Sequence, residues 1–405
     1  MPPSIDFWFD YTCPYAYLAS TQVEALARRT GRSLAWRPML LGGVFKAHDT
    51  PQRLFATLSP AKAAHNAADL ARWAARYGVA LRMPAEHPMR SVEALRATLA
   101  TGCDPRVIHG FYRAYWEHSR PISDAAVLRD VLAAAGHDAD AMLARVGDDA
   151  LRDELRRRTD EAIALGVFGA PAYLVDGADL YWGNDRTHLF DVPSSKDDFA
   201  ASPTGRTLEV YWDFSSPYAY LGSLQADALA RRTGATLVWR PLLLGAVFKA
   251  LGQANVPLAT YSAARQRYTA LDLARQARHL DAPFRFPSRF PMSTVKALRA
   301  WIALPEGRRD AFRAAVFRAY WSDDRDINDD AVLAELIGDG ADATLARTQS
   351  PEVKQSLVAA TQRALDAGVF GVPTWVVDGR DLFWGSDRVS LVEHALTAPR
   401  EDASR

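Results

Sequence analysis

Two short motifs place a small polar side chain, suited to sulfur chemistry, directly before a proline. Cys13-Pro14 and Ser216-Pro217 each follow a strand-like run and open a helix-like run. A helix N-terminus presents unpaired N–H groups and the positive end of the helix dipole, so it can stabilise a thiolate bound nearby. The alternative is a plain helix N-cap, which serine favours and cysteine fills poorly. The motif alone leaves both interpretations open.

A second motif, Gly-Val-Phe-Gly-Ala/Val-Pro, ends at Ala170-Pro171 and again at Val372-Pro373, just before a predicted strand. A proline that opens a strand cannot donate to the strand ladder, and its peptide bond is often cis. The backbone of the preceding residue is then available to pair with an extended ligand. The alternative is an ordinary proline between a loop and a strand.

A third motif lies between a predicted strand end and the predicted last helix of each half of the chain. It occurs as Trp182-Gly183-Asn184-Asp185-Arg186 and as Trp384-Gly385-Ser386-Asp387-Arg388. The third and fourth residues of this motif are natural N-caps. They could equally hold an ammonium or amide group of a ligand through charge-assisted hydrogen bonds.

All three motifs occur twice because the chain contains an internal repeat. Asp10–Leu18 recurs as Asp213–Leu221, and the other matching motifs are also about 203 positions apart along the chain. The stretch 191–205 is polar, rich in proline and serine and aperiodic, which is typical of a linker. The sequence therefore predicts two domains, 1–190 and 206–400, joined by this linker.

Each repeat is predicted to begin with a strand, a helix and a second strand, to continue with a helical block, and to end with two short strands. In the first repeat the predicted strands are 5–10, 33–36, 171–175 and 179–182, and the predicted helices are 14–29, 60–77, 90–100, 105–117, 124–135 and 150–164. The second repeat is predicted to follow the same order.

The composition argues against several classes of function. The 405 residues include 48 Lys+Arg against 48 Asp+Glu, so no excess positive charge is available for nucleic acid. No apolar run is long enough to span a membrane, and the first residues do not resemble a secretory signal. We therefore expect a soluble, cytoplasmic protein whose two cysteines are free. The nine histidines show no compact ligand pattern, so we expect no metal and place most of them on surface helices.

In this order and spacing, the three motifs resemble those of the 2-hydroxychromene-2-carboxylate isomerases. These enzymes are relatives of the kappa-class glutathione transferases in the DsbA-like branch of the thioredoxin superfamily. The resemblance covers nearly the whole chain, twice, and its most specific parts are 213–218, 244–249, 368–373 and 383–388. It implies an α/β fold of two thioredoxin-like (DsbA-like) domains, each with an inserted helical domain. It also implies glutathione as the cofactor, a small aromatic carboxylate as the substrate and a role in the catabolism of aromatic compounds.

The resemblance assigns the principal site to the second repeat. Ser216 falls on the family's serine that hydrogen-bonds the glutathione sulfur. Val372 and Pro373 fall on the pair whose backbone meets the cysteinyl part of glutathione. The family's glutathione-anchoring loop falls on Trp384, Gly385, Ser386 and Asp387.

Three further residues of the second repeat are candidates on the same grounds. Asn255 falls on an asparagine of a family loop that contacts glutathione, and Lys249 and Arg240 are candidates for binding the substrate carboxylate. The positions equivalent to the principal site in the first repeat hold Cys13, Ala170, Trp182, Gly183, Asn184 and Asp185.

The first repeat departs from the family pattern at two places. Cys13 replaces the serine, and the loop at 48–51 is expected to be about three residues shorter than its counterpart and to lack the asparagine. Our expectation is that the first site is degenerate. The alternative is that Cys13 has a different role, such as a mixed disulfide with glutathione.

Three hypotheses for the function remain. In the first, a glutathione thiolate adds reversibly to an aromatic-ring-cleavage intermediate, permits bond rotation and leaves. In the second, the chain is a kappa-like glutathione transferase or a DsbA-like thiol oxidoreductase, although neither repeat has the Cys-x-x-Cys that thiol exchange normally uses. In the third, both sites have decayed and the protein only binds ligands. Relatives with one domain per chain form dimers, so this chain is expected to fold as an intramolecular pseudo-dimer that could be monomeric.

Overall fold

The structure is a computed structural model that describes residues 2–191 and 204–399. The chain divides into two compact units, each considered by itself. Unit 1 comprises Met1–Leu58, Asn66–Ser194 and Tyr261–Thr269, and unit 2 comprises Ser59–His65, Ser195–Thr260 and Ala270–Arg405. Most of the predicted linker 191–205 lies outside the described residues, and the domain limits 1–190 and 206–400 stay a prediction.

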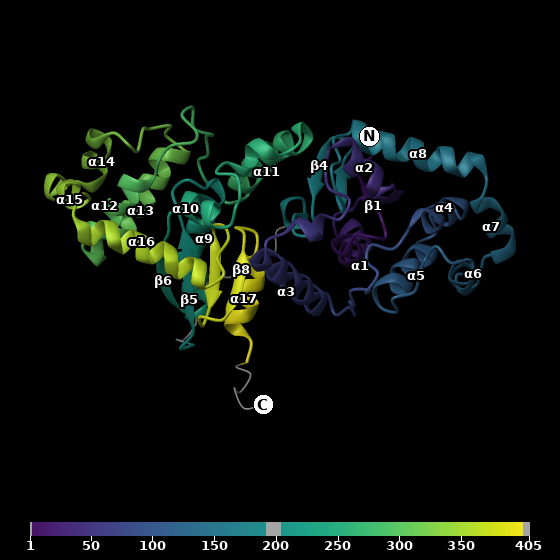
Figure 1. Ribbon diagram of the computed structural model, residues 1–405. Coiled ribbons are helices and arrows are strands. Elements are labelled where there is room, and N and C mark those ends of the chain that lie inside the picture. The colour runs from purple at the N-terminus through teal and green to yellow at the C-terminus, as the bar shows by residue number, and fades with distance from the viewer. Residues whose placement is uncertain (1, 192–203, 400–405) are drawn as a thin grey trace. The chain divides into compact units, whose positions relative to one another are not determined.

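The first repeat contains a four-stranded sheet with a helical block inserted between its second and third strands (Figure 1). Its elements are β1 (Ser4–Phe9), α1 (Pro14–Arg29), β2 (Ser33–Pro38), α2 (Leu41–Ala47), η1 (Leu54–Thr57), α3 (Pro60–Tyr77), α4 (Val92–Ala100), α5 (Pro105–Trp116), α6 (Ala125–Ala134), α7 (Ala139–Val146), α8 (Asp149–Ala164), β3 (Ala172–Val175), β4 (Asp179–Trp182) and η2 (Thr187–Leu189). The strand order is β2-β1-β3-β4, with β1 parallel to β2 and antiparallel to β3.

The second repeat has the same architecture, with strand order β6-β5-β7-β8. Its elements are β5 (Thr207–Trp212), α9 (Pro217–Thr233), β6 (Thr236–Pro241), α10 (Leu244–Ala250), η3 (Pro257–Thr260), α11 (Ala263–His279), α12 (Val295–Ala303), α13 (Glu306–Trp321), α14 (Asp330–Ile337), α15 (Ala341–Arg347), α16 (Pro351–Asp366), β7 (Thr374–Val377), β8 (Asp381–Trp384) and α17 (Val389–Thr397).

The fold predicted from the sequence is confirmed: each repeat is a thioredoxin-like sheet interrupted by helices. The predicted strands and the long helices are present to within a few residues. The short helices α2 and α7 were not predicted, because each has only seven or eight residues and too little periodicity to stand out. The predicted last helix exists in the second repeat as α17, whereas the described residues of the first repeat, which end at 191, have the 3-10 turn η2 there.

The first helix of each repeat begins at the residue singled out in the sequence. Pro14 and Pro217 occupy the first helical turn, where a missing N–H costs nothing. Ser216 caps α9 through its side chain, and Cys13 makes no such cap on α1. α9 ends at Thr233 and is followed by the C-cap residue Gly234, whose φ of 63° is left-handed and suits glycine.

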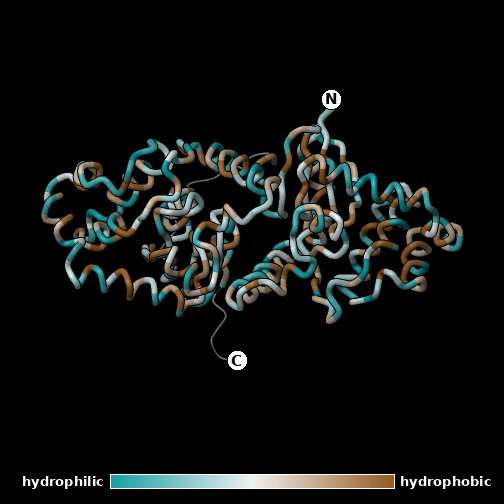
Figure 2. The backbone as a smooth tube through the Cα atoms, turned by 45° about the horizontal axis from the view of Figure 1, so that its top comes forward, coloured by the Kyte–Doolittle hydropathy of each residue, from teal (hydrophilic) through white to brown (hydrophobic). Residues whose placement is uncertain are grey.

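Aromatic side chains fill the core between the sheet and the inserted helices. Apolar and polar segments alternate along the helices in Figure 2, as expected where one helix face is buried. Within this core, Trp321 Nε1 on α13 donates to Phe214 O (2.7 Å), and Trp116 Nε1 on α5 donates to Tyr11 O (2.8 Å). The inserted helices therefore fix the short segment that leads from the first strand to Ser216 or Cys13.

We expect Trp321→Phe to lower the free energy of unfolding of unit 2 by about 1–3 kcal/mol, because the Phe214 carbonyl then stays buried without its donor. Urea denaturation monitored by circular dichroism measures the change. Trp301→Phe is the control, since Trp301 is also buried but its indole N–H has no acceptor among the described residues. Equal losses in the two variants would contradict a specific role for the hydrogen bond.

Candidate functional site

Ser216 lies where β5 ends and α9 begins, next to the residue that precedes a cis proline. Its hydroxyl accepts from Ala219 N (3.2 Å) and donates to Val372 O (3.2 Å), and the side chain is buried. The Val372-Pro373 peptide bond is cis, as the motif predicted. Ser216 is therefore an N-cap, and it also contacts the backbone that the resemblance assigns to ligand binding.

The backbone of Val372 has one group available for a ligand. Its carbonyl accepts from Ser216, whereas its N–H meets no acceptor in the described part of the chain. A backbone donor next to a cis proline can pair with an extended peptide-like ligand as an added strand would.

Trp384 packs closely on the glycine that opens the cis-proline loop. A Cβ built on Gly371 would lie 2.6 Å from Trp384 Nε1, and in the first repeat a Cβ on Gly169 would lie 2.6 Å from Trp182 Nε1. Only glycine allows this approach. The Trp384 indole N–H is buried and has no acceptor among the described residues, so it is a second donor that a peptide-like ligand could satisfy.

The loop after Trp384 is held from within unit 2. Gly385 has a φ of 118°, a conformation that favours glycine. The Ser386 hydroxyl donates to Gln276 Oε1 (2.9 Å), and the Ser386 carbonyl accepts from Gln225 Nε2 (3.0 Å). The side chain and the carbonyl of Ser386 are therefore both engaged by the protein, and Ser386 is buried whereas Asp387 is only partly buried.

The N-cap roles predicted for this loop are wrong. Helix α17 begins at Val389 with Arg388 at the cap position and without a side-chain cap. Asp387 instead pairs with Arg388 (2.8 Å), and Asp185 pairs with Arg186 (3.0 Å) in the first repeat. Asn184 is buried, and its Nδ2 has no acceptor among the residues described.

His65 is a site residue that the sequence did not reveal. Its Nε2 accepts from Trp384 N (3.1 Å), its ring contacts Phe370, and only 6% of the residue is exposed. The expectation that the histidines lie on surface helices is wrong for this one. The segment Ser59–His65 belongs to unit 2 although it is far from Trp384 in sequence, so no local pattern announces the contact. In unit 1, Tyr268 takes the equivalent role, because its hydroxyl accepts from Trp182 N (2.9 Å).

The loop with Asn255 has the same length in both repeats, contrary to the prediction. Six residues separate the short helix from the 3-10 turn in each case, 48–53 and 251–256. A Cβ on Gly245 would lie 2.9 Å from Asn255 Oδ1, and a Cβ on Gly42 would lie 2.9 Å from Gln52 Oε1. Gln52 therefore takes the place of Asn255, and the error arose because the prolines of the two loops are not at equivalent positions.

The structure does not group the two candidates for the substrate carboxylate with Ser216. Lys249 is exposed on α10. Arg240 lies on β6, where its Nε donates to Glu209 Oε1 (2.7 Å), and it lines a cavity to which neither Ser216 nor Val372 contributes. Their role in binding a substrate stays a prediction.

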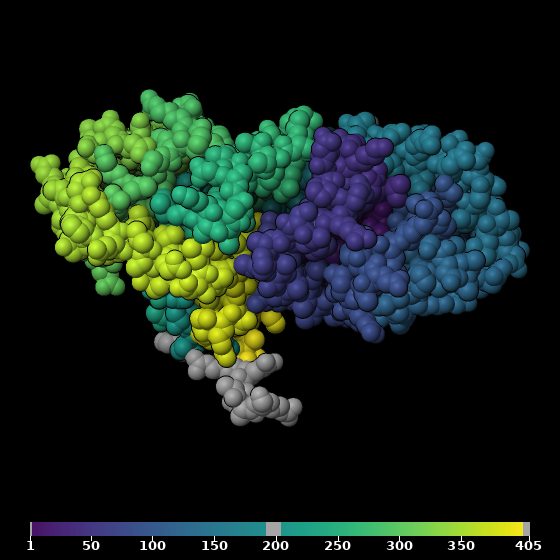
Figure 3. Space-filling view, in the orientation of Figure 1, coloured from purple at the N-terminus to yellow at the C-terminus, as the bar shows by residue number. Residues whose placement is uncertain are grey.

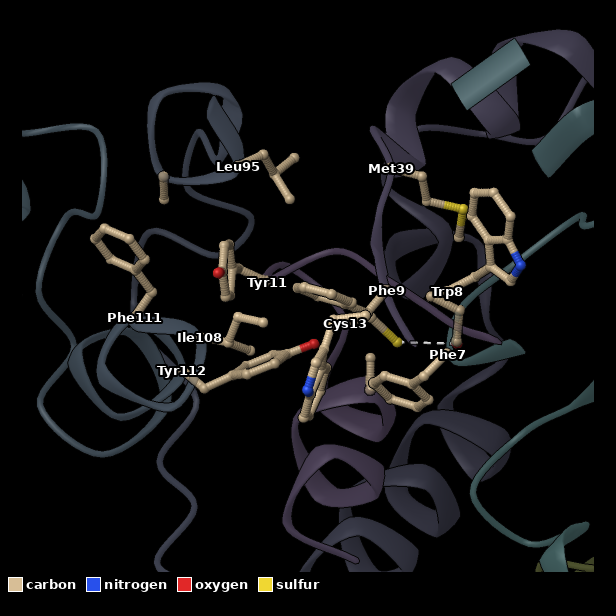
Figure 4. Packing of buried hydrophobic residues seen from close by; sticks show 14 of the residues in the cluster. Phe7, Trp8, Phe9, Tyr11, Cys13, Met39, Leu95, Ile108, Phe111 and Tyr112 are labelled. Carbon is tan, nitrogen blue, oxygen red and sulfur yellow. Dashed lines mark hydrogen bonds between the residues drawn. The ribbon is translucent and has the colours of Figure 1, made fainter. Parts of the chain in front are cut away.

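In unit 1, Cys13 occupies the position that Ser216 has in unit 2, but the sulfur of Cys13 is poorly suited to react. Its Sγ donates to Ala170 O (3.1 Å), the Ala170-Pro171 bond is cis, and Figure 4 shows the thiol among the aromatic rings of Phe9 and Tyr112. Burial raises the pKa of Cys13 to about 12, and hydrogen bonds from Ala16 and Tyr15 offset only part of this effect. The thiol is therefore neutral near pH 7.

The described residues offer little support for metal or disulfide chemistry. They contain no group of three His, Cys, Asp or Glu side chains that could hold a metal ion. Cys13 and Cys103 are both free, as predicted. Among the described residues, no helix is long and apolar enough to cross a membrane.

Comparison with known proteins identifies the family. Residues 4–192 and 207–397 each match the family described as DSBA-like thioredoxin domain. The chain therefore belongs to this family and carries its domain twice.

Individual relatives place the chain more narrowly. A 2-hydroxychromene-2-carboxylate isomerase of Sphingobium xenophagum is 34% identical over 201 residues, which cover 47% of this chain and 97% of the relative. Glutathione S-transferase kappa 1 of Homo sapiens is 31% identical over 212 residues, covering 48% of this chain and 92% of the relative. A solved structure of a 2-hydroxychromene-2-carboxylate isomerase is 25% identical with a TM-score of 0.41, covering 45% of this chain and 89% of the other. The twofold domain match and the two sequence relatives confirm the predicted membership of the isomerase and kappa transferase group, with a tandem duplication.

We expect Cys13 in the folded chain to react with iodoacetamide at pH 8 at least about 100-fold more slowly than in the urea-unfolded chain, because a thiol with so high a pKa has almost no thiolate at that pH. The rate should then rise about tenfold for each pH unit between 8 and 10, since the thiolate fraction rises by that factor. Mass spectrometry of the Cys13 peptide, in a Cys103→Ser background, measures both. Similar rates in the folded and unfolded chains would contradict a buried neutral thiol.

Proposed function

We propose that this chain is a glutathione-dependent isomerase of the 2-hydroxychromene-2-carboxylate type and that unit 2 carries the activity. The observation that supports it most is the contact of the Ser216 hydroxyl with the carbonyl before a cis proline, beside the open N–H of Val372. The similarity to enzymes with this activity points the same way. Glutathione would be the cofactor, and a small aromatic carboxylate the substrate.

The residues of unit 2 would bind and orient the cofactor. Glutathione, when bound, supplies a thiolate that adds reversibly to the substrate. The Ser216 hydroxyl can turn its proton from Val372 O toward the sulfur, and the N-terminus of α9 favours negative charge at the same place. Ser216 needs no basic partner for this role, because it donates a hydrogen bond and does not attack.

A buried carboxylate keeps the junction in shape. Asp213 is fully buried and accepts from Ser215 N (3.0 Å) and Leu244 N (2.7 Å), which ties the segment before Ser216 to the start of α10. Burial raises the pKa of Asp213, although the hydrogen bonds from Leu244, Thr294 and Ser215 act in the opposite direction. Its place below the helix start makes Asp213 a positioning residue.

A kappa-like glutathione transferase is the second candidate. The human kappa transferase is 31% identical over 48% of this chain, and the transferase reaction would need the same thiolate site. Comparing isomerisation of 2-hydroxychromene-2-carboxylate with conjugation of 1-chloro-2,4-dinitrobenzene, each with and without glutathione, separates the two activities. Thiol–disulfide exchange has weaker support, because unit 2 has no cysteine in the part of the chain described and Cys13 is buried.

We expect Ser216→Ala to lower glutathione-dependent kcat by more than about tenfold, because the sulfur loses a hydrogen-bond donor, and Cys13→Ser to change kcat by less than about twofold. Steady-state isomerisation kinetics measure both. Ser216→Thr serves as the control, since it keeps the hydroxyl and the cap. The reverse ranking of the first two variants would place the active site in unit 1.

We expect Gly371→Ala to raise the Kd for glutathione by at least about tenfold, because the new Cβ would displace the Trp384 indole from the cis-proline loop. The matched variant Gly169→Ala creates the same conflict with Trp182 in unit 1 and should leave the measured Kd unchanged. Isothermal titration calorimetry with glutathione tests the pair. Loss of binding in Gly169→Ala alone would contradict the assignment to unit 2.

A further inference from the structure

A cavity of about 480 Å³ lies in unit 2 beside the edge strand β6. Strands β5 and β6 and helices α12, α13 and α16 supply its lining: Glu209, Tyr211, Trp239, Arg240, Trp301 and Arg363 are the residues that matter here. None of Ser216, Val372 or Trp384 belongs to this lining. The cavity is therefore distinct from the proposed glutathione site, and its volume is in the range of small-molecule pockets.

The lining combines aromatic surface with buried donors. Trp301 is only 7% exposed, and Tyr211 and Trp239 add two more aromatic side chains. The indole N–H groups of Trp239 and Trp301 are buried and have no acceptor among the described residues. A buried donor without an acceptor is destabilising, and an oxygen atom of a bound ligand would relieve this.

The lining holds three arginines, Arg240, Arg309 and Arg363, and two carboxylates, Glu209 and Asp366. Arg240 pairs with Glu209, and Arg309 donates to Ile302 O and Leu304 O (3.0 Å each). Asp366 lies one turn from Arg363 on α16, but the guanidinium of Arg363 forms no ion pair or hydrogen bond among the described residues. Arg363 is exposed on α16, a helix that Figure 3 shows in yellow-green at the surface of unit 2.

A further positive charge lies behind the aromatic wall. The Arg313 guanidinium stacks on Trp239, 3.4 Å from the ring centre, and its side chain is only 4% exposed. Its nearest carboxylate is that of Asp310, at 3.5 Å. Burial lowers the pKa of Arg313 more than Asp310 and Asp227 restore it, so this cation is incompletely compensated. An anion in the cavity would be attracted by it.

Unit 1 keeps Trp36 and Arg37 in the places of Trp239 and Arg240, but it differs from unit 2 at other positions of the lining. It has Thr98 where unit 2 has Trp301, Ile108 for Arg313, Arg158 for Ala360 and Glu161 for Arg363. Arg158 is also paired with Glu154 at 2.7 Å, and Glu154 occupies the position that the exposed Ser356 has in unit 2. Unit 2 therefore combines Trp301, the buried Arg313 and the unpaired Arg363, and unit 1 has different residues at all three positions.

We propose that this cavity is a binding site for a planar aromatic carboxylate, with the ring against Trp239 and Trp301 and the carboxylate at Arg363. A flat ring suits the aromatic walls, and an anionic oxygen suits both the guanidinium and the indole N–H donors. The site is a second one in unit 2 and goes beyond the proposed reaction, since it requires neither glutathione nor Ser216.

The test is equilibrium dialysis of the full chain against 2-naphthoate, without glutathione. We expect one site per chain and at least about tenfold weaker binding of the neutral 2-naphthalenemethanol. Arg363→Glu and Ala360→Arg install the residues of unit 1, and each should weaken 2-naphthoate binding at least about tenfold. Binding that is unchanged in both variants, or absent at millimolar 2-naphthoate, overturns the proposal.

Two controls separate this site from the proposed active site. Ser216→Ala should bind 2-naphthoate like the parent chain, whatever its effect on turnover. Arg152→Glu removes an exposed arginine from the equivalent helix α8 of unit 1 and should also leave binding unchanged. Loss of binding in Ser216→Ala would show that 2-naphthoate occupies the active site instead, and loss in Arg152→Glu would show that binding responds to net charge alone.

Discussion

The structure of each unit depends on one contact between segments that are about 157 residues apart in sequence. The side chain at the start of the first helix reaches the carbonyl that precedes the cis proline, as Cys13 Sγ to Ala170 O at 3.1 Å and as Ser216 Oγ to Val372 O at 3.2 Å. The contact requires the first strand to lie beside the third, because only then do the two loops meet at the same end of the sheet. The whole helical insertion must therefore begin and end close to this point, and its tryptophans anchor the junction from the other side.

The same contact has different chemical consequences in the two units. A fully buried aspartate, Asp10 or Asp213, lies beneath the junction in each, and burial raises the pKa of both. Burial without water at this site disfavours any further charged group of the protein, such as a Cys13 thiolate. The high pKa of Cys13 follows directly from this. A serine hydroxyl carries no charge and escapes this penalty. The serine is therefore the side chain that fits a junction where the negative charge arrives with a ligand.

The sequence predicted the parts of the site that depend on local chemistry. Ser216, the cis bond at Val372-Pro373 and the glycine-containing loop at Gly385 could all be located from motifs, because each motif carries its own backbone geometry. The parts that depend on distant packing were not predictable. His65 reaches Trp384 N across more than half of the chain, and the hydroxyl of Ser386 is taken by Gln276 rather than by the helix it precedes. The equivalence of Gln52 and Asn255 was hidden because the match lies in geometry and not in residue type.

Comparison of the two repeats separates the residues that maintain the backbone from those of the proposed ligand sites. Backbone-supporting residues are shared between the repeats: Thr159 and Thr361 each accept from the residue before the short helix, and Gly169 and Gly371 each admit a tryptophan. Pairs that differ include Cys13 and Ser216 at the junction, and Ile108 and Arg313 at the cavity. A buried arginine is costly unless something offsets its charge, whereas isoleucine at the same place costs nothing electrostatically. At Arg313, unit 2 thus accepts an energetic cost that unit 1 avoids, and ligand binding at the adjacent cavity could compensate it.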